Sequence, residues 1–287
     1  MHLVIIAFIL LGPIIVLGVW LWLRSRRERP YLAEPLDIGR VFGGTFSVLG
    51  RGNLPVILLA IAVLGGARGI ATIITHYWVS LPPLPQPGDP AYLASLWPRF
   101  EFELATGLGL FVAGLCFHIP AILFLVKKQE GAEITFRQAA TSIPKYILPV
   151  IGLTIVMTIG VGFASLLFLI PGVILWLSWL AAMVALVTEG DSIFGALRRS
   201  RELSVGSRGR ILLIVILLGL IAAIVLWPMA KLEQDQITGH FAVSVVVQMA
   251  VATITGLLGV GFSTSLYVEL RRIREGGAMP GLAEVFA

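Results

Sequence analysis

Residues 146–188 read YILPVIGLTIVMTIGVGFASLLFLIPGVILWLSWLAAMVALVT and contain no Asp, Glu, Lys or Arg. As a single helix, these 43 residues would be about 65 Å long, roughly twice the thickness of the hydrocarbon core of a bilayer. The stretch therefore predicts two membrane-spanning helices. Ile170-Pro171-Gly172 is the expected break between them, because proline removes a backbone donor and glycine favours turns.

Similar uncharged runs occur along the whole chain, which has the composition of an integral membrane protein. Hydrophobic residues make up 57% of its 287 residues, charged residues make up only 13%, and the mean hydropathy is +0.95. These values exclude a soluble globular enzyme and a disordered chain, and the long runs exclude an outer-membrane barrel of alternating strands. The runs predict seven spans, at about residues 3–23, 54–80, 104–126, 146–169, 172–188, 211–230 and 243–268.

The expected fold is therefore all-α, a polytopic transmembrane helix bundle. It would comprise an N-terminal anchor with a basic cytoplasmic flank at 1–29, a six-span membrane domain at 34–275 and a short cytoplasmic tail at 276–287. The first span is preceded by no basic segment and followed by no evident small-residue cleavage site, so it is typical of a retained anchor rather than a signal peptide.

The basic residues indicate the orientation of the spans. If the N-terminus lies outside, 18 of the 21 Lys and Arg residues fall in cytoplasmic segments, only Arg99 and Lys231 fall outside, and Arg68 falls within a span. This asymmetry follows the positive-inside rule and places the C-terminus in the cytoplasm. The net charge of +5 then requires no nucleic-acid partner, because basic flanks of spans meet anionic lipid.

The two kinds of loop differ in pattern. The outer loop, residues 81–103, is rich in proline and is expected to be extended or irregular. Three inner loops each carry a short amphipathic pattern before a span, at about 38–49, 136–143 and 191–204. Thr135 and Gln138 have the spacing of a capping box, which places a helix start in the second of them.

One part of the chain resembles a known family. Ile170-Pro171-Gly172-Val173, a span ending at Thr188-Glu189-Gly190, and Gly195-Ala196-Leu197-Arg198-Arg199-Ser200 form the pattern. It is similar to the membrane domain attached to some glycerophosphoryl diester phosphodiesterases and to related uncharacterised bacterial multi-pass families. The likeness covers about residues 34–275 and implies six core spans in a bacterial cytoplasmic (inner) membrane.

The resemblance does not imply the hydrolase activity. In those phosphodiesterases, hydrolysis belongs to a separate barrel domain with metal-binding carboxylates and histidines, and the sequence has no such domain. Its four histidines, His2, His76, His118 and His240, have no metal-ligand spacing with another His, Cys or carboxylate pair. We therefore expect no enzymatic activity, no metal and no cofactor.

Arg68 is the most unusual charge in the sequence. An arginine within a span costs roughly 2.5–3.5 kcal/mol on insertion scales, so it normally has a partner or a wet cavity. Two interpretations are open: Arg68 contacts an anion or a lipid phosphate, or its side chain snorkels to the outer interface. Snorkelling is favoured, because Arg68 would lie off the centre of the bilayer.

Two further intramembrane features have structural explanations. Gly65 and Gly69 have small-xxx-small spacing, which predicts close approach of another helix, with a hinge as the alternative. His118 lies two residues before Pro120. We expect a neutral histidine that bonds a carbonyl freed by Pro120, rather than a proton relay.

The third amphipathic segment is the best candidate for lipid contact. Asp191 or Ser192 can cap its start, and Arg198, Arg199 and Arg201 could each gain about 1 kcal/mol from anionic headgroups. Glu189 could pair with Arg198 or Arg199 and fix this segment against its hairpin.

Together these observations favour a non-enzymatic integral membrane protein that organises or handles lipid. Its expected partners are membrane lipids, with a second membrane protein left open and no oligomeric state defined. The alternative is a transporter or channel for a small anionic or lipidic substrate, which Arg68 and the glycine-rich spans would favour. An intramembrane enzyme ranks third, because the sequence shows no nucleophile with a base.

Overall fold

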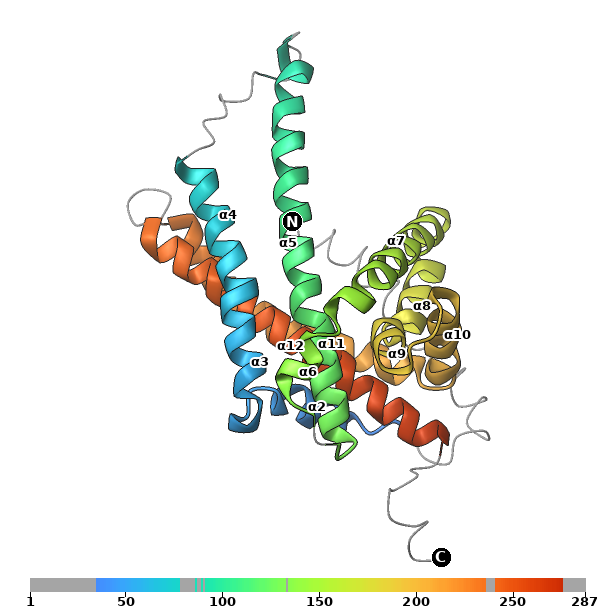
Figure 1. The fold of residues 1–287 in the computed structure, drawn as a ribbon. Helices are drawn as coiled ribbons and strands as arrows, with labels where there is room; N and C mark the ends of the chain where they lie inside the picture. The colour runs from blue at the N-terminus through green and yellow to red at the C-terminus, as the bar shows by residue number, and fades with distance from the viewer. Residues whose placement is uncertain are drawn as a thin grey trace, which may run out of the picture.

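The computed structural model describes residues 35–77, 86, 89, 91–132, 134–235 and 241–275. Within these residues all regular structure is helical, and no strand occurs (Figure 1). Six helical stretches are long and apolar enough to cross a membrane, which makes this a multi-pass membrane protein. They are Leu54–Tyr77, Ala94–Gln129, Ile143–Leu167, Leu169–Glu189, Arg208–Trp227 and Phe241–Glu275.

The all-α bundle and the six core spans are thus confirmed. The predicted N-terminal span 3–23, its flank to residue 29 and the tail 276–287 lie outside the described residues. The first span is built from three segments: α3 (Leu54–Leu59), the π-helical segment η3 (Ala60–Gly65) and α4 (Gly66–Tyr77). A 3-10 turn, η2 (Arg51–Asn53), precedes them.

All three predicted amphipathic segments form helices with a side-chain cap. Asp37 caps α2 (Ile38–Ser47), Thr135 and Gln138 form the expected capping box of α6 (Phe136–Ala140), and Ser192 caps α10 (Ile193–Ser204). Each cap accepts a hydrogen bond from a first-turn N–H that has no partner in the helix. Of the two caps considered for the third segment, the structure uses Ser192, whose Oγ accepts from the Gly195 N–H at 3.1 Å.

The break inside residues 146–188 was predicted two residues too late. α7 (Ile143–Leu167) ends before Phe168, whose extended backbone separates it from α8 (Leu169–Trp179). Pro171 lies in the first turn of α8, where a missing N–H costs no hydrogen bond, so it starts this helix instead of interrupting it. A Cβ on Gly172 would lie 2.8 Å from Ser165 Cα, so this glycine allows α8 to fold back closely on α7.

The prediction of an irregular outer loop over 81–103 was wrong for its second half. α5 (Ala91–Gln129) begins at Ala91 and contains both Pro98 and Pro120. At about 1.5 Å per residue its 39 residues measure about 58 Å, well beyond the hydrocarbon core. Apolar side chains at helical spacing, such as Phe100, Leu104 and Leu108, continue the pattern of the span and override the proline signal.

The last span, α12 (Phe241–Glu275), crosses the bundle diagonally in Figure 1 and ends at its lower right. α9 (Ala182–Glu189) completes the span begun by α8, and α11 (Arg208–Asp235) follows α10. α12 contacts α2, η3, α4, α5, α9, α10 and α11. Gly261 allows a close approach to the backbone of α2, because a Cβ there would lie 2.5 Å from the Thr45 carbonyl oxygen.

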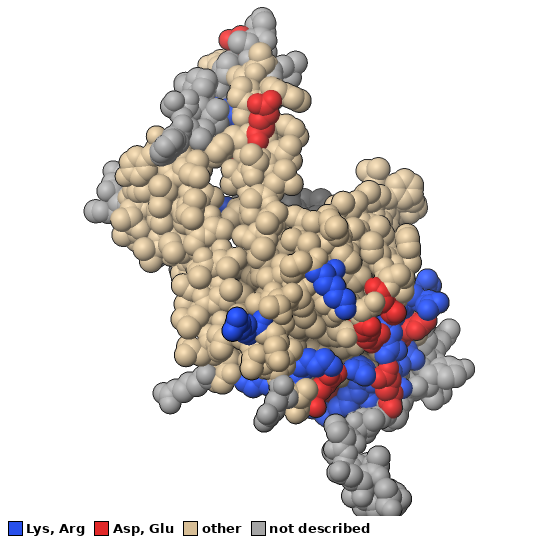
Figure 2. All heavy atoms as spheres, in the orientation of Figure 1, with Lys and Arg blue, Asp and Glu red and all other residues tan. Residues whose placement is uncertain are grey.

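Charged residues gather at one end of the bundle. Figure 2 shows most of the visible blue and red spheres over the lower part of the molecule, below a large uncharged surface. That surface includes strongly exposed apolar side chains such as Leu148, Leu166 and Ile224, as expected of spans that face lipid. We call the end that holds Lys127, Glu189 and Glu275 the charged end.

Candidate functional site

A cavity of about 360 Å³ lies in the membrane-spanning part of the bundle. It is formed between the η3–α4 helix, α5 and α12. None of its lining residues is fully buried, so the cavity opens at the surface of the bundle. The lining residues are Leu64, Ala67, Arg68, Leu110, Ala113, His118, Ala252, Thr255 and Gly256.

The cavity brings together the two polar residues that the sequence placed in separate spans, Arg68 and His118. Lys128, near the end of α5, donates to the Gly52 carbonyl oxygen, just before α3, at 2.6 Å. These two residues therefore lie at the same height at the charged end, and depths along both helices can be measured from them. His118 lies about 15 Å above this level along α5, and Arg68 lies about 24 Å above it along its own helix. The cavity therefore occupies the middle and far part of a core of about 30 Å.

Arg68 has no counter-charge within this site. Among the residues that the structure describes, no hydrogen bond or ion pair reaches its guanidinium group. Its backbone carbonyl accepts from Thr72 Oγ1 at 2.9 Å, as in an ordinary helix turn. The rest of the cavity wall is apolar except for His118 and Thr255.

The expected partner of His118 was wrong. Its Nδ1 lies 2.8 Å from the Gly114 carbonyl oxygen, so Nδ1–H donates to a residue four positions earlier. The carbonyl that Pro120 frees belongs to Cys116, which lies two positions before His118 and therefore on nearly the opposite face of the helix. With Nδ1–H engaged, Nε2 is the ring atom left for a ligand.

Gly65 and Gly69 lie against α12 beside this cavity. A Cβ on Gly65 would be 2.8 Å from Thr253 Oγ1, and a Cβ on Gly69 would be 2.8 Å from Met249 Sδ. The two glycines therefore allow α4 and α12 to approach closely. A hydrogen bond of 2.9 Å between Thr72 and Gln248 crosses the same interface.

At the charged end, acidic and basic side chains alternate in a continuous network that we call the charge chain. Its members, in order of contact, are Glu189, Arg199, Glu275, Arg271, Glu130 and Lys127. Arg199 Nε lies 3.0 Å from Glu189 Oε1, and Arg199 Nη2 donates to Glu275. The pairing of Arg199 with Glu189, one of the two pairings considered for Glu189, is thus present.

The other half of the charge chain connects α12 to α5. Arg271 bonds Glu275 at 2.8 Å and Glu130 at 2.7 Å, and Lys127 bonds Glu130 at 3.0 Å. Tyr267 adds a neutral donor, because its hydroxyl lies 2.6 Å from Glu189 Oε1. The charge chain therefore joins the ends of α5, α9 and α12 to the middle of α10.

The charge of Arg199 is stabilised by these contacts. Burial alone would lower the pKa of its guanidinium, but hydrogen bonds to Glu275 and Glu189 outweigh burial and raise it. Because Arg199 is committed to two carboxylates and only 26% of its side chain is exposed, it does not lie on the outer face of α10. The expected contact of Arg199 with anionic lipid stays a prediction, and the two carboxylates compete with it.

The outer face of α10 is formed by other residues. Phe194 is 73% exposed, the Arg198 side chain is 79% exposed, and Arg201 is exposed as well. Positions i, i+4 and i+7 share one face of a helix. Arg198 is paired only loosely, at 3.9 Å, with the exposed Glu202. The opposite face packs inward, where Ser200 Oγ donates to the Ser178 carbonyl oxygen at 2.8 Å.

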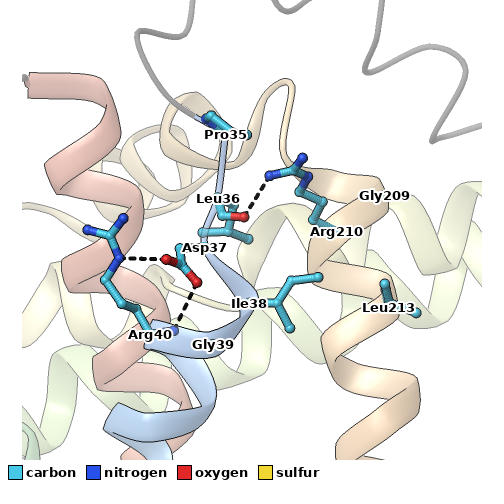
Figure 3. Close-up of a pocket in the computed structure, with 9 residues that line it drawn as sticks. All are labelled: Pro35, Leu36, Asp37, Ile38, Gly39, Arg40, Gly209, Arg210 and Leu213. Carbon is cyan, nitrogen blue, oxygen red and sulfur yellow. Dashed lines mark hydrogen bonds and ion pairs between the residues drawn. The ribbon is translucent and has the colours of Figure 1, made fainter.

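A second cavity, of about 660 Å³, lies at the charged end between the start of α2 and the start of α11 (Figure 3). Arg210 Nη1 donates to the Leu36 carbonyl oxygen at 2.8 Å. Asp37 accepts from Arg40 at 2.9 Å, and hydrogen bonds from the Arg40 side chain and backbone lower the pKa of this carboxyl. The bond from Arg210 connects α11 to the residues just before α2, whereas the Asp37–Arg40 contact lies within the first turn of α2.

The sequence reasoning missed several residues of the charged end. Glu130, Arg271, Glu275 and Tyr267 were not singled out, and only the spacing of Arg271 and Glu275, four residues apart on one helix, could have suggested a pair. The contact of Arg271 with Glu130 joins residues 141 positions apart, which no local pattern indicates.

Comparisons with known proteins gave no match: no family model, curated protein or solved structure resembles the chain at a significant level. Among the described residues, no group of three or more His, Cys, Asp or Glu side chains is placed to hold a metal ion. The cavity and the charged end are therefore the two features of the molecule that bear on its function.

Proposed function

We infer that this protein is a non-enzymatic integral membrane protein that binds and organises lipid. The observation that carries this proposal is the outer face of α10, which presents an aromatic residue and two arginines, Phe194, Arg198 and Arg201, away from the bundle. An aromatic ring and basic groups on one helix face suit the boundary between hydrocarbon and anionic headgroups.

The proposal includes an orientation in a bacterial inner membrane. The charged end faces the cytoplasm, with the N-terminus outside and the C-terminus inside, because the inner segments carry most of the Lys and Arg residues. In this orientation α10 lies at the cytoplasmic leaflet. The proposal leaves room for a membrane-protein partner.

We expect removal of the two outward charges to deplete anionic lipid around the protein. In the double variant Arg198→Gln/Arg201→Gln, each lost charge should remove about 1 kcal/mol of attraction to anionic headgroups. The measurement is the ratio of phosphatidylglycerol to phosphatidylethanolamine that co-purifies in polymer-bounded nanodiscs. The double variant Arg198→Lys/Arg201→Lys keeps both charges and should retain the native ratio, whereas an unchanged ratio in the glutamine variant would contradict the proposal.

Cysteine labelling tests the orientation. In a Cys116→Ala background, a cysteine at Asp89 or Glu101 should react with an impermeant maleimide in intact spheroplasts, because both positions are exposed and lie outside in the proposed topology. A cysteine at Gln129 or Glu202 should react only after permeabilisation. Glu202 is suited to this test because its side chain is 62% exposed. An inverted labelling pattern would overturn the orientation.

A second candidate function is transport of a small anionic or lipidic substrate. The Arg68 cavity favours it, because an unpaired cation in an apolar wall is suited to an anionic ligand. Transport requires release of the ligand on both sides of the membrane, whereas binding alone does not. Flux of a fluorescent phospholipid or of labelled phosphate across proteoliposomes therefore distinguishes the two functions.

A further inference from the structure

We propose that the cavity between α4, α5 and α12 binds the phosphate-bearing headgroup of a membrane phospholipid, with Arg68 as its counter-cation and His118 as a second hydrogen-bonding group. The proposal deepens the proposed function, since it rests on a lipid-binding role and names the chemistry of the ligand. It depends on the cavity alone and not on the outer face of α10.

The first argument is the charge of Arg68. An arginine side chain carries a positive charge, so Arg68 places a full positive charge in the cavity at membrane depth. The part of the chain that the structure describes supplies no acidic or hydrogen-bonding partner for this group. A ligand phosphate would supply both the opposite charge and two acceptor oxygens for the forked donor.

The second argument is the direction in which the side chain leaves its helix. Cα–Cβ bonds tilt toward the N-terminus of a helix, which for α4 means toward the charged end and the middle of the membrane. Snorkelling to the far interface would need the side chain to turn against this tilt. Arg68 instead lines the same cavity as His118. His118 lies about 9 Å closer than Arg68 to the charged end, measured along the helix axis.

The third argument concerns His118 and sets the class of headgroup. Because Nδ1–H donates to the Gly114 carbonyl oxygen, a neutral ring presents the lone pair of Nε2. That lone pair accepts a hydrogen bond, so the ligand should carry a hydroxyl near its phosphate. A phosphatidylglycerol headgroup has both groups, whereas phosphatidylcholine has the phosphate without a donor.

The fourth argument is the shape and polarity of the walls. At about 360 Å³ the cavity is near the lower limit of ligand pockets and fits a headgroup rather than a whole lipid. Small or apolar side chains such as Ala67, Leu110 and Ala113 form much of the lining. Because the cavity opens at the surface of the bundle, acyl chains can remain in the surrounding bilayer.

The experiment is a lipid titration of the full chain in detergent micelles, followed by native mass spectrometry. Phosphatidylglycerol is the probe, and phosphatidylcholine and inorganic phosphate are the comparison ligands. We expect phosphatidylglycerol to bind at a saturable site and Arg68→Gln to weaken it about 10- to 100-fold, the usual effect of losing a charge-assisted hydrogen bond. Arg68→Lys should fall in between, because lysine keeps the charge but not the fork.

Ala113→Phe gives a second, independent variant, since it fills the cavity and leaves both polar groups in place. Ala113→Phe should abolish saturable binding of phosphatidylglycerol, whereas Arg68→Gln should only weaken it. Arg198→Gln is the control outside the cavity and should retain saturable binding of phosphatidylglycerol. Failure of the cavity proposal can therefore be distinguished from failure of the proposed lipid contact on the outer face of α10. Native binding in both cavity variants, or inorganic phosphate bound as tightly as phosphatidylglycerol, would overturn the proposal.

Discussion

Gly261→Ala is expected to lower the free energy of unfolding by about 2–3 kcal/mol, a large loss for one added methyl group. A Cβ at this position would lie 2.5 Å from the Thr45 carbonyl oxygen and 2.8 Å from Val48 Cγ2. The first of these atoms belongs to the backbone of α2, so a side-chain rotation cannot relieve the clash. α2 would have to move away from α12, and the loss can be measured by SDS titration with tryptophan fluorescence as the signal.

Gly259→Ala is the matched control for this prediction. It adds the same group two residues earlier on the same helix, where a Cβ would meet no atom within 4 Å. Alanine should be neutral there or stabilise by up to about 1 kcal/mol through its higher helix propensity. Equal losses in the two variants would show that α12 is intolerant of alanine in general and that the α2 contact is not responsible.

Arg199→Met should destabilise the bundle by about 2–3 kcal/mol. Arg199 joins α10 to α9 through Glu189 and to α12 through Glu275, and its hydrogen bonds to carboxylates are of the strong, charge-assisted kind. Methionine keeps the apolar stem but removes every donor, which leaves two partly buried carboxylates with fewer partners. The same SDS titration measures the loss.

Arg198→Met is the comparison, because Arg198 is the neighbouring residue and pairs loosely with the exposed Glu202 at 3.9 Å. An exposed pair of this kind contributes about 0–1 kcal/mol. If the two methionine variants lost equal stability, the charge chain would not be a tie between helices. Arg199→Lys should fall between them, since one ammonium group cannot reach both carboxylates in a fork.

The sequence was sufficient for the features that depend on local chemistry. Hydropathy located the six spans because each must bury about 20 consecutive residues in lipid, and short polar residues at the right spacing located the starts of α6 and α10. The errors arose where a proline was interpreted without its position in the helix. Pro171 begins α8 and Pro98 lies within α5.

The candidate site was harder to predict, because it depends on how helices pack. Arg68 and His118 were each recognised as unusual, yet nothing in a single sequence states that η3–α4 and α5 place them around one cavity. The partner predicted for His118 was wrong because the carbonyl that Pro120 frees faces another side of the helix. His118 instead bonds the Gly114 carbonyl oxygen. Most of the charge chain was missed for the same reason, since its links join residues far apart in sequence.

The π-helical segment η3 has a consequence for the angular position of everything that follows it. A π segment is equivalent to an α-helix into which a residue has been inserted, and one residue corresponds to about 100° of rotation about the axis. Deleting one residue from Ala60–Gly65 would therefore restore α-helical winding and leave Gly69 facing Met249 and Arg68 facing the cavity, because the wide turn takes up the extra residue. The wide turn thus acts as a phase shift in the first described span: regular α-helical winding of the same residues would turn Gly69 and Arg68 about 100° away from the faces that they occupy.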